Sequence, residues 1–220
     1  MAHNYVTKKL NLSTTSATTV YTVPSEKTAF VNSLRLVETS GNNTYFTVTI
    51  TDSSANVFSV YTSLFFVPAG AEAEGFSRNM TLNEGDILKV TAAVADRLTI
   101  HASILERDQG VNNKFIAKRN DYTSANETTV YTVPAAKKAI LSEFWFSNDD
   151  TGNTIAATVK MYNSEGTAFI LSEGTIAAGV SGEAMARPQI MDESEAIKVT
   201  AGTANRLHTH FSILEIGNPG

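Results

Sequence analysis

Two histidines near the C-terminus, His208 and His210, have the type and spacing that most directly suggest chemistry. Side chains two residues apart on a β-strand point to the same face, so both imidazoles could reach one metal ion. The sequence repeats internally, however, and the earlier copy has His101 in place of His210 but Thr99 in place of His208. No carboxylate is placed by spacing as a third ligand. We therefore predict no metal, and we assign both histidines to the outer face of a strand near a domain or subunit contact.

Other constellations that could do chemistry are incomplete. Asp149, Asp150 and Asn153 offer oxygen ligands, but they lack the graded spacing of a calcium loop, which favours an ordinary turn. The sequence contains no G-x-S-x-G nucleophile elbow, no phosphate-binding glycine loop and no cysteine. We expect no catalytic residue, no cofactor and no enzymatic activity.

Arginines recur immediately before the last predicted strand of each copy, at Arg97 and Arg206. Each could pair with a repeated acid of its own copy, such as Glu106 or Glu215, or bond to a neighbouring subunit. We favour the internal structural role.

The only tryptophan, Trp145, occupies the position of Arg35 in the first copy, on what the strand phase indicates is the non-core face. An outward aromatic residue is a candidate contact residue, although the other domain could cover it. Trp145 and Tyr162 are also the aromatic residues that could serve a carbohydrate-binding or adhesive module, and neither is repeated in the first copy.

The internal repeat governs the domain organisation. The heptapeptide TTVYTVP at 18–24 recurs at 128–134 and is followed in both copies by K-x-A. The copies also end alike, with KVTA at 89–92 and 198–201, A-[DN]-R-L at 95–98 and 204–207, and SILE at 103–106 and 212–215. We predict an N-terminal arm over 1–13, a first domain over 14–107, a linker over 108–123 and a second domain over 124–220.

Alternation of apolar and polar residues predicts an all-β fold. The segment 46–50 places Phe46, Val48 and Ile50 on one face with threonines on the other. Turn residues separate such segments, which favours two tandem β-sandwich or jelly-roll-like domains. We expect no long helix and six to eight strands in each copy, which in the first copy cover 18–23, 29–37, 45–51, 57–66, 76–81, 87–92 and 97–106. The helix-like composition of 135–144 is outweighed by its strand-like counterpart at 28–36.

Composition excludes several partner classes. The formal net charge is −5 with dispersed lysines and arginines, which disfavours binding to nucleic acid. No segment approaches the roughly 20 apolar residues that cross a bilayer, and the N-terminus lacks the apolar region of a signal peptide. We expect no membrane partner and a protein that remains soluble where it is synthesised.

The repeated start and end motifs resemble those of small β-rich virion structural proteins of tailed bacteriophages, in which such modules occur singly or in tandem. The resemblance implies a particle component made in the bacterial host cytoplasm, foremost a capsid decoration (cement) protein. A tail, neck or fibre-associated protein is the alternative within this class. Its partners would be the major capsid protein or tail components, and its motif positions are scaffold positions that carry no functional residue.

Such a protein would act as a homo-oligomer, with a trimer as one option, because each copy is small and gains stability from burial between subunits. The arm could supply a contact: its Leu10 and Leu12 could add a strand to a neighbour's sheet, and Lys8 and Lys9 could meet an acidic surface. The predicted interface residues are Lys8, Lys9, Leu10, Leu12, Trp145, His208 and His210.

Overall fold

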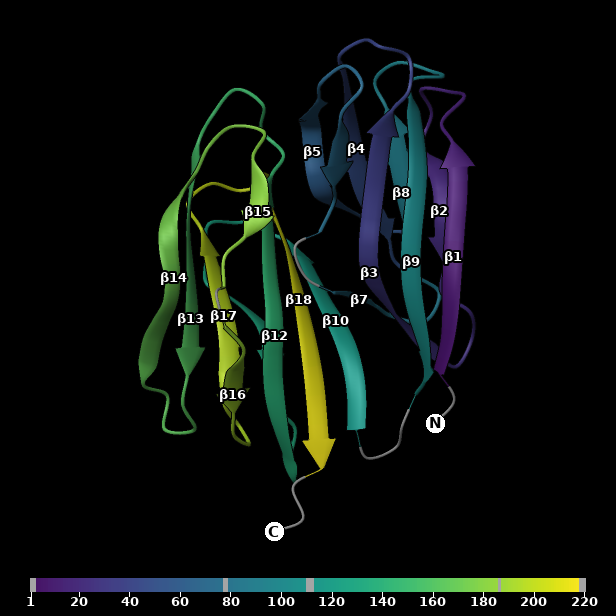
Figure 1. Ribbon diagram of the computed structural model, residues 1–220. Helices are drawn as coiled ribbons and strands as arrows, with labels where there is room; N and C mark the ends of the chain where they lie inside the picture. The colour runs from purple at the N-terminus through teal and green to yellow at the C-terminus, as the bar shows by residue number, and fades with distance from the viewer. Residues whose placement is uncertain (1–2, 77–78, 110–112, 186, 218–220) are drawn as a thin grey trace. The chain divides into compact units, whose positions relative to one another are not determined.

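The computed structural model describes residues 3–76, 79–109, 113–185 and 187–217. Every regular element within them is a β-strand, as the sequence predicts (Figure 1). The chain divides into two compact units, Met1–Gln109 and Gly110–Gly220. We call them the first and second modules, and each contributes nine of the strands.

Two sheets form the first module. One has the strand order β1 (His3–Asn11), β9 (Leu98–Asp108), β3 (Lys27–Glu38) and β6 (Glu72–Glu74), with β7 (Met80–Leu82) also paired to β3. The other has the order β2 (Thr18–Thr22), β8 (Ile87–Ala92), β4 (Thr44–Thr51) and β5 (Val57–Val67).

The pairing is nested. The hairpin of β4 and β5 is enclosed by the pairing of β3 with β6 and β7, then by β2 with β8, and finally by β1 with β9, all antiparallel. A long hairpin wrapped in this way, with alternate pairs assigned to opposite sheets, is the jelly-roll arrangement. The last strand therefore lies inside its sheet, between β1 and β3.

The second module repeats this topology strand for strand. Its first sheet contains β10 (Asn113–Asp121), β18 (Leu207–Gly217), β12 (Lys137–Asn148) and β15 (Ser181–Glu183), with β16 (Gln189–Met191) also paired to β12. Its second sheet contains β11 (Thr128–Thr132), β17 (Ala196–Ala201), β13 (Ile155–Tyr162) and β14 (Ala168–Ile176).

The A-[DN]-R-L motif has a backbone reason. Asp96 and Asn205 adopt the left-handed conformation, with φ of 59° and 58°, which Asp and Asn tolerate better than most residues. This turn lets the amide of Asp96 donate to the carbonyl of Leu12 at 2.8 Å, and the amide of Asn205 donate to the carbonyl of Tyr122 at 2.7 Å. The final strand of each module thus begins at a turn fixed by its first strand.

The predicted core residues face the space between the two sheets. Phe46, Val48 and Ile50 are buried, and so are Leu98, Ile100, Ala102 and Ile104 of β9. Their counterparts Val159, Leu207, Phe211 and Ile213 are buried in the second module, while Ala157 and Met161 pack against that core as half-buried residues.

Three sequence predictions need correction. Residues 3–11 are strand β1, which pairs with β9 of its own module, so they are not a free arm. Residues 113–121, predicted to belong to the linker, are strand β10, which pairs with β18. Each module has nine strands because of these first strands, and because β6 and β7 replace the single strand predicted over 76–81, of which residues 77–78 lie outside the described part.

Replacement of Leu12 by alanine should destabilise the first module. Leu12 is fully buried, its amide donates to the carbonyl of Leu98 at 2.9 Å, and its side chain fills core that alanine would leave empty. We expect a loss of about 2–5 kcal/mol in the free energy of unfolding. Urea titration of Leu12→Ala against the exposed-site control Ser13→Ala measures it, and equal midpoints would show that the Leu12 side chain does not stabilise the core.

Candidate functional site

The predicted interface residues of the N-terminal segment do not all face the same side of the sheet. Leu10 and Lys8 occupy inward positions of β1, opposite Ile100 and Ala102, and Leu12 is core. Lys9 points outward and is exposed. Leu12 is buried in its own module and Leu10 is half-buried, but β1 is an edge strand, so the predicted contact with a neighbouring sheet stays a prediction.

The repeated arginines serve their own modules, but not through the predicted acids. The Arg97 guanidinium donates to the carbonyl of Asn43 at 2.8 Å, and Arg206 Nε lies 2.9 Å from Asp150 Oδ2. Each arginine therefore ties the turn before the last strand to the loop that follows the third strand of its module.

The repeated acids instead accept from the tyrosines of the TTVYTVP motif. Tyr21 Oη donates to Glu106 Oε1 at 2.8 Å, and Tyr131 Oη donates to Glu215 Oε1 at 3.1 Å. Burial, followed by the hydrogen bond and charge of Glu106, raises the pKa of Tyr21, and burial and the charge of Glu215 raise that of Tyr131. Each pair joins the two sheets of a module, which explains why both ends of the repeat keep these residue types.

His208 lies between two carboxylates at the outer face of β18. Its Nδ1 forms an ion pair with Asp121 of β10, and its Nε2 lies 2.5 Å from Asp149 Oδ2. Spacing alone places no carboxylate beside this histidine, but β-pairing brings Asp121 next to His208 from a segment predicted to be linker. The acids occupy opposite ring nitrogens, an arrangement that holds a protonated imidazolium and leaves neither nitrogen for a metal.

The charge state of His208 follows from these partners. Burial alone would lower the pKa of His208, but the hydrogen bonds and charges of Asp121 and Asp149 outweigh it and raise the pKa to about 9. His208 is thus charged at neutral pH and joins β10, β18 and the loop after β12.

His210, unlike His208, forms no hydrogen bond with a carboxylate. It belongs to a series of hydrogen bonds that runs across the same sheet. Arg119 Nε donates to His210 Nδ1 at 3.1 Å, His210 Nε2 lies 3.3 Å from Ser212 Oγ, and Ser212 Oγ donates to Glu143 Oε2 at 2.9 Å. Burial, and then the Arg119 charge, lower the pKa of His210 well below its usual value.

This series of hydrogen bonds contains the residue types of a Ser-His-acid triad, but in the wrong order. A catalytic histidine accepts the serine proton and is oriented by a carboxylate at its other nitrogen. Here the serine donates to the carboxylate, and the other nitrogen of His210 faces a guanidinium, so His210 cannot serve as the general base.

The Asp150 carboxylate in the loop after β12 accepts hydrogen bonds from its own loop. Asp150 Oδ1 accepts from the amides of Gly152 at 2.8 Å and Asn153 at 3.0 Å, and these bonds, first that of Gly152, lower the pKa of Asp150. The carboxylate oxygens are used by a turn of the kind the sequence predicts. Among residues 3–76, 79–109, 113–185 and 187–217, no group of three or more histidine and acidic side chains is placed to hold a metal ion.

Trp145 and Tyr162 do not form one aromatic platform. Trp145 lies on the outward phase of β12, as predicted, but it is only 4% exposed, so it is not the open contact residue that the sequence suggests. Tyr162 lies on β13 of the other sheet, where its Oη donates to Glu127 at 2.8 Å and Lys198 Nζ lies 4.1 Å from its ring centroid.

The outer face of the first sheet carries an apolar row in each module, which sequence reasoning missed. In register across four strands, it consists of Tyr5, Leu105, Phe30 and the polar Thr81 in the first module, where Phe30 and Thr81 are buried, and of Phe115, Leu214, Ile140 and Ile190 in the second. We call it the outer-face row. Tyr5 is 77% exposed and Ile190 is 68% exposed.

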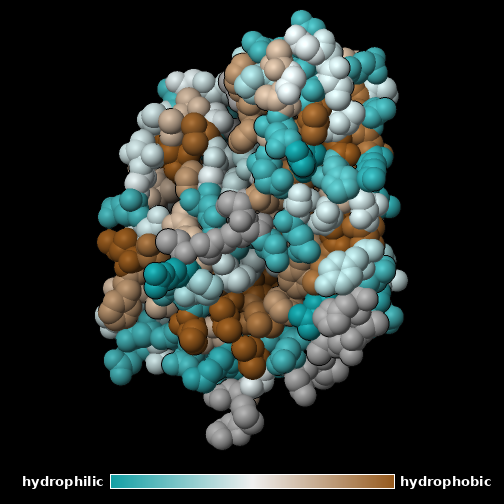
Figure 2. Space-filling view, in the orientation of Figure 1, coloured by the Kyte–Doolittle hydropathy of each residue, from teal (hydrophilic) through white to brown (hydrophobic). Residues whose placement is uncertain are grey.

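Hydrophobic residues gather over β12 and β16 on the drawn face of the second module (Figure 2). The outer face of an antiparallel sandwich is normally polar, so an apolar row at the same register in both modules needs an explanation beyond the fold. Only strand pairing reveals it, because its members come from segments far apart in the sequence.

The described residues contain no helix with the length and hydrophobicity that crossing a lipid bilayer would require.

Comparison with known proteins gives distant likenesses only. No protein-family model matches the sequence, and no curated protein is similar to it. A chain in the structure of Sulfolobus turreted icosahedral virus is 13% identical, with coverage of 100% of this chain and 58% of that chain and a TM-score of 0.35. This chain therefore spans less than two thirds of that one.

Two further structures are similar at the same level. The major capsid protein from bacteriophage PM2 is 8% identical, with coverage of 98% and 97% and a TM-score of 0.31. The CBM22-1–CBM22-2 tandem domain of Paenibacillus barcinonensis Xyn10C is 11% identical, with coverage of 88% and 79% and a TM-score of 0.26. These values show a shared all-β architecture and carry no function, so the resemblance to tailed-phage structural proteins stays a prediction.

The His208 ion pairs should make stability depend on pH. The pKa rises from an ordinary value of 6.5 to about 9 in the folded state, so the stabilisation is complete below pH 6.5 and is lost as the pH rises through 9. Replacement by threonine, the residue at position 99, should cost on the order of 2–3 kcal/mol at pH 6 and little at pH 10. Urea titrations of wild type and His208→Thr at both pH values test this, and a pH-independent difference would contradict the assignment.

Proposed function

We propose that this chain is a non-catalytic structural component of a bacteriophage particle, which decorates the head and stabilises it through contacts between subunits. The outer-face row carries this proposal. Apolar residues on the outward face of a sheet gain free energy only when another surface covers them.

The duplication of the row suits a protein that bridges neighbours. The exposed members of the two rows are Tyr5 in the first module and Ile190 in the second. An assembly that engages both modules at once would bind this chain bivalently, and weak single contacts would then add up to firm binding. Stabilisation of a lattice requires this property, whereas catalysis does not.

The titratable residues support a structural role. The charged pairs of His208 and the Tyr21–Glu106 and Tyr131–Glu215 hydrogen bonds lie within modules and fix strands to one another. His210 is held neutral against a guanidinium, which removes the most suggestive base of the sequence.

The partners we propose are the major capsid protein and further copies of this chain, with a tail, neck or fibre location as the alternative. The net charge of −5 and the hydrophobic character of the row favour a protein surface over nucleic acid as the partner. A carbohydrate-binding role gains no support from Trp145 and Tyr162, because they lie on different sheets.

Replacement of Ile190 by threonine, the residue at the corresponding position 81, should weaken assembly without unfolding the second module. Ile190 is 68% exposed, so its substitution removes a docking contact and little core. We expect attachment to particles that lack the protein to fall roughly tenfold, which corresponds to about 1.4 kcal/mol. Co-sedimentation with isolated heads and isolated tails measures attachment and separates the two locations, and sedimentation velocity measures self-association.

The control is Val57→Thr, a comparable apolar-to-threonine change at a 52% exposed residue of β5 outside the row. It should attach like the wild type. If Ile190→Thr attaches to heads and to tails as well as Val57→Thr does, the outer-face row is not the docking surface and the proposal loses its main support.

A further inference from the structure

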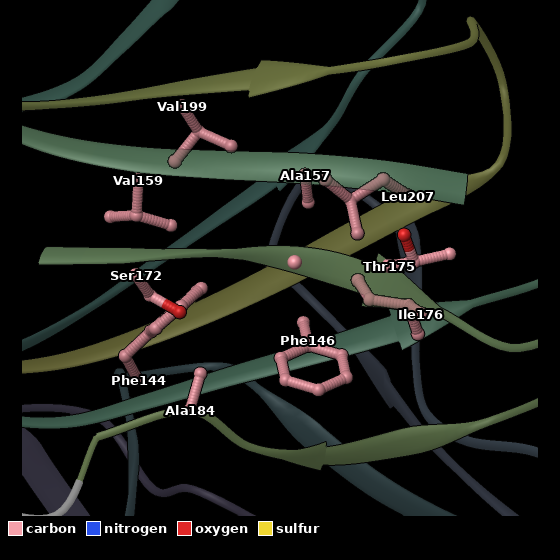
Figure 3. A pocket seen from close by; sticks show the side chains of 11 residues that line it. Phe144, Phe146, Ala157, Val159, Ser172, Thr175, Ile176, Ala184, Val199 and Leu207 are labelled. Atoms are coloured by element: carbon pink, nitrogen blue, oxygen red, sulfur yellow. The ribbon is translucent and has the colours of Figure 1, made fainter. Parts of the chain in front are cut away.

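A pocket of about 230 Å³, partly open to solvent, lies between the two sheets of the second module (Figure 3). In Figure 3 the ring of Phe146 and the small side chain of Ala157 lie on different sides of the hollow. Its lining includes Phe144 and Phe146 of β12, Ala157 and Val159 of β13, and Ser172 and Gly174 of β14.

The first module shows what occupies this space when it is filled. Phe46 lies opposite Ala92 in the KVTA motif, and Ala157 lies opposite the matching Ala201. Ala157 therefore stands where the first module has Phe46.

At two neighbouring positions of the edge strand β14, a small residue likewise replaces an aromatic residue of the first module. Phe65 lies opposite Phe46, and Gly174 lies opposite Ala157. Likewise Tyr61 lies opposite Val48, and Ser172 lies opposite Val159, its counterpart. Alanine, glycine and serine thus replace three aromatic residues at one place in the fold.

In the first module these aromatic rings form one cluster. The ring centroids of Phe46 and Phe65 are 5.1 Å apart, those of Tyr61 and Phe65 are 4.9 Å apart, and those of Phe46 and Tyr61 are 6.0 Å apart. Such contacts stabilise a core beyond the area they bury.

The second module compensates only in part. Phe144, Phe146 and Phe211 stand where the first module has Leu34, Leu36 and Ala102, and Phe144 stacks on Phe211 at 4.6 Å between centroids. A Cβ atom built on Gly174 would meet no atom within 4 Å, so space remains on the β14 side.

Protein interiors are close-packed, so an unfilled volume of this size between two sheets forfeits stability even where, as here, it opens partly to solvent. A cavity of about 150 Å³ lined by apolar side chains stays dry and takes up benzene. The hollow of the second module is larger, and aromatic rings fill the same place in the first.

We propose that this cavity is a binding site for one aromatic ring. The ring can belong to a free small molecule or to a side chain that a partner strand inserts beside β14. The second source is geometrically available because β14 is the edge of its sheet, and a strand added there would direct alternate side chains toward Ser172 and Gly174.

Toluene is the first probe. In the full chain, toluene should saturably shift the methyl NMR signals of Val159 and Val199, which line the cavity, and should raise the thermal midpoint of the second module. Ala157→Phe, which restores the residue of the first module, should abolish the shifts. Gly174→Val fills the space from the opposite strand and serves the same purpose if Ala157→Phe does not fold.

The matched control is Phe46→Ala, which opens the homologous position of the first module and should create a second toluene site there. The proposal is overturned if toluene leaves the Val159 and Val199 signals unchanged in the wild-type protein, or shifts them equally in a folded cavity-filling variant.

A capped pentapeptide with phenylalanine at its centre, flanked by valine and threonine, distinguishes the two sources. Competition with toluene by this peptide, and not by its alanine-centred counterpart, shows that a partner side chain can fill the site. Binding of toluene alone assigns the site to free aromatic molecules. Equal binding of both peptides at these methyl groups would contradict recognition of a ring.

Discussion

The space between the two sheets of each module is the constraint on which the rest of the structure depends. Nested pairing places the last strand inside its sheet, so β9 and β18 each present one face to that space and the other face outward. Once Ile104 and Ile213 face the core, the phase of the strand sends Leu105 and Leu214 to the outer face. The same requirement that closes the sandwich therefore determines which residues are available to a partner.

Much of the fold can be predicted from local patterns. Alternation in 46–50 identifies β4 and its inward face, and homology with the first copy correctly makes 137–148 a strand despite its helix-forming alanines and lysines. The first strands, β1 and β10, are not predicted because their alternation of apolar and polar residues is interrupted. In β1 an inward position holds Lys8, whose aliphatic stem is half-buried at the sheet edge, and in β10 the consecutive residues Ile116 and Ala117 are both buried.

The charged contacts depend on pairing between distant segments, which one sequence does not reveal. His208 is visible as a candidate, but Asp121 reaches it only through the β10–β18 register, and Asp149 only through the loop after β12. Glu106 and Glu215 are visible as repeated acids, and the sequence offers the nearby arginines as partners. The structure gives them the motif tyrosines instead, because these side chains meet between the sheets.

The two modules show how far a core can change while its strand pairing stays the same. Backbone hydrogen bonds, the turn at Asp96 or Asn205 and the tyrosine–glutamate bridge are equivalent in both, and none of them depends on the side chains at Phe46 or Ala157. The second module lacks three aromatic residues on one sheet and gains Phe144, Phe146 and Phe211 on the facing sheet, so its packing differs while its topology is the same. The first module keeps the aromatic cluster of Phe46, Tyr61 and Phe65, whereas the second retains the same frame around a partly open pocket. A duplicated scaffold whose copies share one frame can thus reserve one copy for stability and leave the other free to acquire contacts.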